Sequence, residues 1–221
     1  MKILERLKSK NKKTKNINLK KKICITILMI IPFISMLLVI SFRHVAMPTN
    51  EEILEDVKNM KGYESIVEYT IMNNRGTYTD KTKVLFSKDY GTRIDFGEDI
   101  TKIYKDDHIK MIYNKKNESY EVKRDLDKFY TLATMKEIFN NPIVKLEEGK
   151  DEWGDLEYLK VNFELIFNNN HLDKATLYIN KSKREPMLIK IYDNEGKERV
   201  KIEYREFFKI NKNLEEHFKV G

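Results

Sequence analysis

The residues best suited to ligate a metal or to transfer a proton are four histidines, which lie far apart in the sequence. They are His44, His108, His171 and His217. None stands near a second histidine or a cysteine at the spacing of a metal site. His108 follows Asp106 and Asp107, but an acidic cluster of this kind at a hairpin turn is usually just solvated. We therefore expect neither a metal nor another cofactor.

Other catalytic patterns point the same way. The 8 glycines are scattered, so no glycine-rich loop is available to hold a phosphate. No Gly-x-Ser-x-Gly motif places a serine nucleophile on a sharp turn. Carboxylates are numerous, but none lies in a glycine- and aromatic-rich setting that singles it out as a general acid or base. The sequence therefore predicts a protein that is not an enzyme.

Trp153 is the single tryptophan, and it lies in a polar turn at residues 151–155. Two interpretations remain open. The indole ring packs onto the core from a loop, or it is an exposed anchor for a partner protein, because tryptophan is enriched at the energetic centres of interfaces.

The segment Ile23 to Phe42 is the longest apolar stretch of the chain. It has 20 residues, of which 16 are apolar and none is charged. A helix of this length spans about 30 Å, the thickness of the hydrocarbon core of a bilayer. Pro32 lies near its middle, which a membrane helix tolerates. We expect a transmembrane anchor; a cleaved signal peptide is the alternative, although no Ala-x-Ala site follows.

The charges on either side of this segment predict its orientation. Residues 1–22 carry ten Lys/Arg and one Glu, and such basic flanks stay in the cytoplasm. The rest of the chain has 32 basic and 34 acidic residues, so its charge is near −2 and gives no nucleic-acid-binding pattern. Cys24 is the only cysteine, which rules out a disulfide within the chain. An exported protein without disulfides is typical of Gram-positive bacteria.

These observations divide the chain into four parts. They are a basic cytoplasmic tail (1–22), the membrane anchor (23–42), a linker (43–48) and one extracytoplasmic domain (49–221). The protein is thus expected in the cell membrane, with a single span and its N-terminus inside. The domain begins with an amphipathic helix, for which Thr49 and Glu52 form a capping box and Gly62 is the stop.

After this helix the pattern changes to short β-rich runs separated by turn residues. We expect about ten strands in consecutive hairpins, such as residues 100–105 and 108–114. One interruption, Leu126 to Asn141, has helical spacing and contains a second capping box, Thr134 and Glu137. The absence of alternating strands and helices argues against a parallel sheet. The predicted fold class is mainly β (α+β), with an antiparallel sheet.

The order of these elements resembles a known family. The stretches TNEEILEDVKNMKGYESIVEYTI and TMKEIFNNP, and a final hairpin with Asn180, Pro186, Asp193 and Gly196, are similar to the LolA/LppX lipoprotein-carrier superfamily. More narrowly, the pattern resembles the clostridial germination lipoprotein GerS group. The fold implied is a curved antiparallel half-barrel with helices over its concave face. Candidate apolar residues lining that face are Ile94, Phe96, Ile103, Met111 and Tyr113.

The resemblance also implies a function. In lipoprotein carriers the concave cavity binds acyl chains. In the GerS group the role is that of a non-enzymatic partner that binds and activates a CwlD-type cortex amidase in sporulation and germination. We expect this second role here, in a form anchored by residues 23–42, because the lipobox cysteine of the GerS group is missing. A lipid- or lipoprotein-binding carrier and an envelope-stress sensor are the alternatives. Edge strands of a half-barrel would also allow a homodimer.

Overall fold

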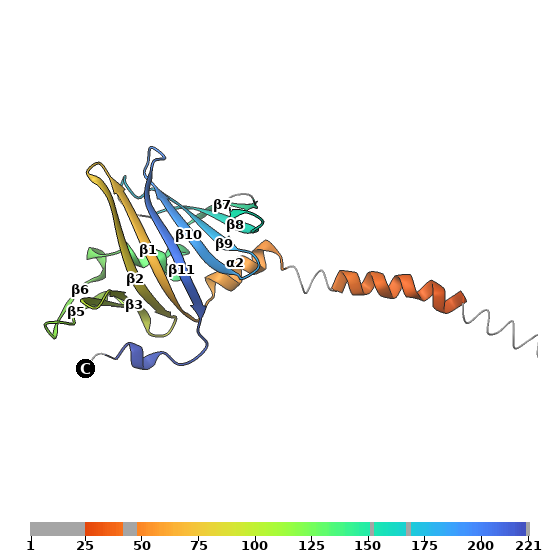
Figure 1. Cartoon of the computed structure of the whole chain (residues 1–221), viewed down its shortest axis with the longest axis horizontal. Coiled ribbons are helices and arrows are strands. Elements are labelled where there is room, and N and C mark those ends of the chain that lie inside the picture. The colour runs from red at the N-terminus through yellow and green to blue at the C-terminus, as the bar shows by residue number, and fades with distance from the viewer. Residues whose placement is uncertain (1–24, 42–47, 151–152, 167–168, 220–221) are drawn as a thin grey trace, which may run out of the picture. The chain divides into compact units, whose positions relative to one another are not determined.

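The computed structural model describes residues 25–41, 48–150, 153–166 and 169–219. The chain divides into two compact units, Met1–Thr49 and Asn50–Gly221. In the first unit, residues 25–41 form a helix (Figure 1). The side chains of this helix are exposed. Within the described ranges, no helix is both long enough and apolar enough to cross a membrane. The predicted tail (1–22), the two ends of the predicted anchor and most of the predicted linker lie outside the described residues.

The second unit is built on one antiparallel sheet of 11 strands in the described part of the chain. The strands are β1 (Gly62–Asn73), β2 (Gly76–Ser87), β3 (Gly91–Phe96), β4 (Ile100–Lys105), β5 (His108–Tyr113), β6 (Glu118–Lys123), β7 (Ile143–Gly149), β8 (Tyr158–Glu164), β9 (Lys174–Asn180), β10 (Glu185–Tyr192) and β11 (Glu198–Lys209). The helices are α2 (Asn50–Lys58) and α3 (Met135–Ile138), with 3-10 turns η1 (Arg124–Leu126), η2 (Tyr130–Ala133) and η4 (Glu215–His217).

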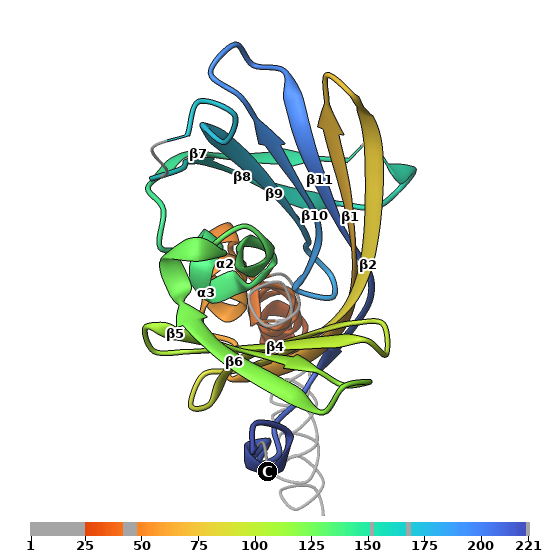
Figure 2. The ribbon, with the colours of Figure 1, turned by 90° about the vertical axis from the view of Figure 1, so that its left-hand side faces the viewer.

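The strand order shows how the sheet is joined. It runs β6-β5-β4-β3-β2-β1-β11-β10-β9-β8-β7, so the first and last strands lie at the centre and β6 and β7 form the two edges. The sheet curves strongly, and α2 and α3 lie inside the curve (Figure 2). The predicted antiparallel sheet with helices over its concave face is confirmed.

Alternation along the central strands decides which side chains face the helices. In β1, Tyr63, Val67 and Tyr69 are fully buried, whereas Glu64 and Glu68 between them are only half-buried. Successive side chains of a strand point to opposite faces, so one face carries the apolar core and the other carries charge. The strand ends at a tight hairpin in which Asn73 pairs with Gly76, as the turn residues of the sequence predict.

Helix α2 covers part of the concave face. Ile53 and Val57 lie four residues apart on one side of the helix and are both buried. Glu51 and Glu52 occupy its first turn and Lys58 its last, which suits the helix dipole at both ends. The amphipathic helix predicted at this position is confirmed, and its apolar stripe joins the main core.

The mid-chain segment, defined here as residues 124–141, is expected from its sequence to form one or two short helices over the sheet. It contains the short helix α3 and the 3-10 turns η1 and η2. Thr134 has an extended backbone, with φ −94° and ψ 140°, and its hydroxyl accepts a hydrogen bond from the backbone N–H of Glu137 at 3.4 Å. The predicted N-cap is therefore present, and it starts the short helix α3.

Candidate functional site

Three tyrosines of β1 and β11, of which Tyr63 and Tyr69 are buried and Tyr204 is half-buried, bind the mid-chain segment to the concave face. The Tyr63 hydroxyl accepts from the Met135 N–H at 3.1 Å, Tyr69 donates to the Tyr130 carbonyl at 2.8 Å, and Tyr204 donates to the Ala133 carbonyl at 2.7 Å. Burial raises the pKa of all three hydroxyls, because the phenolate would lose its hydration. The bonds satisfy backbone groups of the segment that its own turns leave unpaired.

An acidic side chain fixes the start of the same segment. Asp127 accepts hydrogen bonds from Lys102 Nζ at 2.5 Å and from the Tyr104 hydroxyl at 3.0 Å. The Lys102 ammonium also lies over the rings of Phe96 and Tyr130, 4.8 Å and 5.1 Å from their centroids. Burial and the neighbouring Asp127 carboxylate both raise the pKa of Tyr104. These polar groups are thus used to hold the segment on the sheet.

The strand registers show which face each predicted lining residue occupies. Ile94 pairs with Lys102, which pairs with Met111, and Phe96 pairs with Ile100, which pairs with Tyr113. Because cross-strand partners share a face, all four predicted residues of these rows lie on the concave side, with Lys102.

Ile103 departs from the predicted lining. It pairs with Arg93 and Lys110, on the convex face of the sheet. The other four residues are largely covered rather than open. Ile94 is fully buried in the core, and the Phe96 ring meets the Tyr130 ring edge-on at 4.7 Å. The mid-chain segment therefore fills much of the cavity that was predicted for a ligand.

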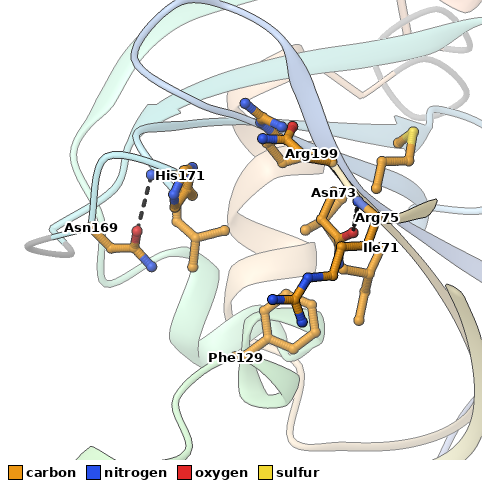
Figure 3. A pocket seen from close by; sticks show the side chains of 11 residues that line it. Ile71, Asn73, Arg75, Phe129, Asn169, His171 and Arg199 are labelled. Carbon is orange, nitrogen blue, oxygen red and sulfur yellow. Dashed lines mark hydrogen bonds between the residues drawn. The ribbon is translucent and has the colours of Figure 1, made fainter. Parts of the chain in front are cut away.

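A cavity of about 580 Å³ remains beside the mid-chain segment, near the tip of the β1–β2 hairpin. Its walls come from that hairpin, from Phe129, from the loop before β9 and from the start of β11 (Figure 3). The apolar residues among them are Ile71, Met72, Phe129, Leu172 and Val200. We call it the hairpin cavity.

Polar groups surround the mouth of the hairpin cavity. Asn73 Oδ1 accepts from the Arg75 N–H at 2.8 Å, and Asn169 Oδ1 accepts from the His171 N–H at 3.0 Å (Figure 3). Arg199 donates from Nε to the buried Asp193 at 2.6 Å. Burial opposes ionisation of Asp193, but bonds from the Lys197 N–H and from Arg199 outweigh it and lower the pKa of the carboxyl. The positive charge of Arg199 is therefore already compensated by the Asp193 carboxylate.

The sequence did not single out these rim residues. By themselves, the residues Asn73 to Gly76 and the asparagines near 169 indicate only turns. Three separate segments must meet before their side chains form one rim. His171 is now placed at this rim. Asp106, Asp107 and His108 line a second, polar cavity of about 830 Å³ beside η1. No group of three or more His, Cys, Asp or Glu side chains in the described ranges is arranged to hold a metal.

Trp153 lies on the convex face, where it contacts two tyrosines. Its ring meets those of Tyr158 and Tyr178 edge-on, with centroids 5.1 Å and 5.2 Å away. We call these three rings the outer aromatic cluster. Tyr158 and Tyr178 are buried, but Trp153 is 38% exposed. A Cβ on Gly149 would lie 2.2 Å from the Tyr158 ring, so glycine at this position makes room for the cluster at the edge strand β7.

Solved structures share this fold. An uncharacterized conserved protein from Thermus thermophilus matches with a TM-score of 0.52 and 14% identity, over 77% of this chain and 93% of that one. The LolA superfamily protein NE2245 from Nitrosomonas europaea gives 0.44 and 11%, over 78% and 98%. The Clostridioides difficile complex of the CwlD amidase with the GerS lipoprotein gives 0.38 and 17%, over 73% and 96%.

No curated protein matches this chain by sequence. A family model does match, over residues 20–218, and its description is sporulation protein YdcC-like. This match extends over nearly the whole chain, including every strand of the sheet. The chain belongs to the family of YdcC-like sporulation proteins.

Proposed function

We propose that this chain is a membrane-anchored, extracytoplasmic sporulation protein without catalytic activity, which binds and activates a cell-wall amidase of the CwlD type. The observation that carries the proposal is the match to the YdcC-like sporulation family over residues 20–218. The choice of an amidase as the partner follows from the resemblance of the sequence to the GerS group. In that group, the GerS protein binds an amidase.

The geometry supports a protein-binding role. The chain's own mid-chain segment occupies the concave face, and Tyr63, Tyr69 and Tyr204 hold it there by hydrogen bonds. The convex face instead presents Trp153, a large ring that rests on buried tyrosines and is 38% exposed. A rigid, partly exposed aromatic side chain is a common anchor at protein interfaces. We therefore assign the amidase-binding surface to the outer aromatic cluster.

The anchoring role belongs to residues 23–42. The described part of this stretch, residues 25–41, is helical, and its large apolar side chains are exposed. A helix with exposed apolar side chains on all sides is stabilised in lipid rather than in water. The basic residues at 1–22 favour a cytoplasmic N-terminus, which places the sheet outside, where the cell wall is.

Co-purification tests the proposal directly. The tagged full-length protein, solubilised from sporulating cells, should bring down an N-acetylmuramoyl amidase, and the Trp153→Ala variant should recover less of it. Lys88→Gln, an exposed change in another turn, serves as the control. Deletion of the gene should leave cortex peptidoglycan without amidase-dependent modification. A deletion strain with normally modified cortex would sink the proposal.

A second candidate function is that of a lipid- or lipoprotein-binding carrier. The observation that favours it is the hairpin cavity, which is lined largely by apolar side chains and has a volume of about 580 Å³. Organic extraction of the purified protein, followed by mass spectrometry, should then yield a lipid in stoichiometric amount. Recovery of the amidase without any bound lipid would leave the first function in place and remove this one.

A further inference from the structure

The hairpin cavity has the size and lining of a small-ligand site. Its volume of about 580 Å³ falls within the range of about 300–1,000 Å³ that is typical of such pockets. Val200 is buried and lines the cavity, and the Ile71 and Phe129 side chains face the same space (Figure 3). An apolar group placed there would leave water without losing any hydrogen bond, which favours a ligand with an apolar end.

The charge at the mouth restricts that ligand further. Arg199 is paired with Asp193 at 2.6 Å. Arg75, by contrast, is exposed at the hairpin tip, and its guanidinium has no partner among the side chains of the described ranges. Its side chain extends across the mouth toward Phe129 (Figure 3). One uncompensated guanidinium fits one carboxylate, because its planar N–H groups match both oxygens at once.

Two side-chain amides add hydrogen-bond donors. The Oδ1 atoms of Asn73 and Asn169 accept from backbone N–H groups, which fixes the orientation of each amide. The Nδ2 groups therefore point away from those bonds, and no other described residue accepts from them. A side-chain amide N–H pairs well with the carbonyl oxygen of a peptide bond.

We propose that the hairpin cavity binds the C-terminal end of a peptide whose last side chain is apolar. The apolar side chain occupies the space between Phe129 and Val200, the terminal carboxylate pairs with Arg75, and the last peptide carbonyls accept from Asn73 and Asn169. This goes beyond amidase activation, since the cavity opens at the hairpin tip and the outer aromatic cluster lies on the convex face. Capture of a free C-terminus is a known mode of peptide recognition.

Three small probes test this assignment. The full-length protein is reconstituted in lipid nanodiscs, and empty nanodiscs provide the blank. The probes are a fluorescein-labelled Ala-Ala-Leu peptide with a free carboxylate, the same peptide as its C-terminal amide, and unlabelled decanoate as a competitor. Fluorescence anisotropy should show that the free acid binds at least about tenfold more tightly than the amide, because only the acid forms the charge-assisted pair.

Variants distinguish pairing of the peptide carboxylate with Arg75 from non-specific binding of the peptide to the protein. Arg75→Gln should weaken binding of the free acid by the same factor and leave binding of the amide unchanged. Arg75→Lys should restore part of the difference, and Lys88→Gln, in another exposed turn, should change nothing. Equal binding of acid and amide, an unaltered Arg75→Gln variant, or no peptide binding at all would overturn the proposal. Displacement of the peptide only by decanoate at far lower concentration would assign the cavity to fatty acids instead.

Discussion

Two groups of aromatic side chains lie on opposite faces of the same sheet and make different kinds of contact. On the concave face, Tyr63, Tyr69 and Tyr204 each use their hydroxyl to bind a backbone group of the mid-chain segment. On the convex face, the outer aromatic cluster is held by ring-to-ring contacts, and Trp153 stays partly exposed. The hydrogen bonds on the concave face fix the position of the mid-chain segment. The ring contacts on the convex face leave part of the Trp153 ring accessible to a partner.

The largest expected effect comes from a core residue of the mid-chain segment, which Tyr63, Tyr69 and Tyr204, called the inner tyrosines, hold on the sheet. Ile138, in α3, is fully buried in the core. Ile138→Ala should lower the free energy of unfolding by about 2–5 kcal/mol, because it leaves a cavity that the sheet cannot close. Leu126→Ala, in the same segment but 76% exposed, is the matched control and should change it by under about 0.5 kcal/mol. Equal losses in urea titrations would show that the segment is not packed as described.

Removal of a single inner hydroxyl should have a smaller effect. Tyr204→Phe leaves the Ala133 carbonyl without its 2.7 Å partner. The expected cost is about 1–3 kcal/mol, because a buried acceptor then stays unsatisfied. Tyr120→Phe provides the comparison, since the Tyr120 hydroxyl bonds to Glu118 on the surface at 3.0 Å. Chemical denaturation of both variants measures the difference, and similar values for the two would contradict the structural role of the inner tyrosines.

The inner tyrosines also predict how stability depends on pH. Burial raises their pKa above the ordinary value of 10.0, so the folded state keeps its protons where the unfolded chain loses them. Their contribution to stability is therefore complete below about pH 10 and falls as the pH rises further, by up to about 1.4 kcal/mol per pH unit for each group. Urea midpoints between pH 8 and 11 should show this fall, with a shallower slope for Tyr204→Phe. If the urea midpoint of Tyr204→Phe fell with pH as steeply as that of the wild type, Tyr204 would not contribute to the pH dependence.

The smallest effect on folding is expected on the convex face. Trp153→Ala removes two edge-on ring contacts from a residue that is 38% exposed, which should cost about 1 kcal/mol. Amidase affinity should nevertheless fall by at least about tenfold, and Trp153→Phe should recover part of it. Thermal unfolding and a pull-down on the same preparations give the two values. A variant that loses stability but keeps its partner would make the cluster purely structural.

Much of the sheet was predictable because its signals are local. The run 100–105 was predicted as a strand and is β4, since alternation and flanking turn residues lie within a few positions of each other. The face of a single residue was harder to assign. Ile103 and Tyr104 are adjacent and both apolar, so only the register with Arg93 and Thr92 decides that Tyr104 points inward. The hairpin cavity could not be predicted from the sequence, because its walls come from segments far apart in the chain.

The pairing of β1 with β11 determines when the chain can finish folding. Tyr63 pairs with Lys209, and Ile71 pairs with Val200, so the central seam of the sheet joins the first strand to the last. Every other strand pair in the described sheet is a hairpin between neighbours in sequence, which closes quickly. During synthesis the two halves can therefore form early as separate curved sheets, but they can merge only after the final strand has emerged. A premature stop near residue 195 would remove the seam at the centre of the sheet and not merely trim an edge.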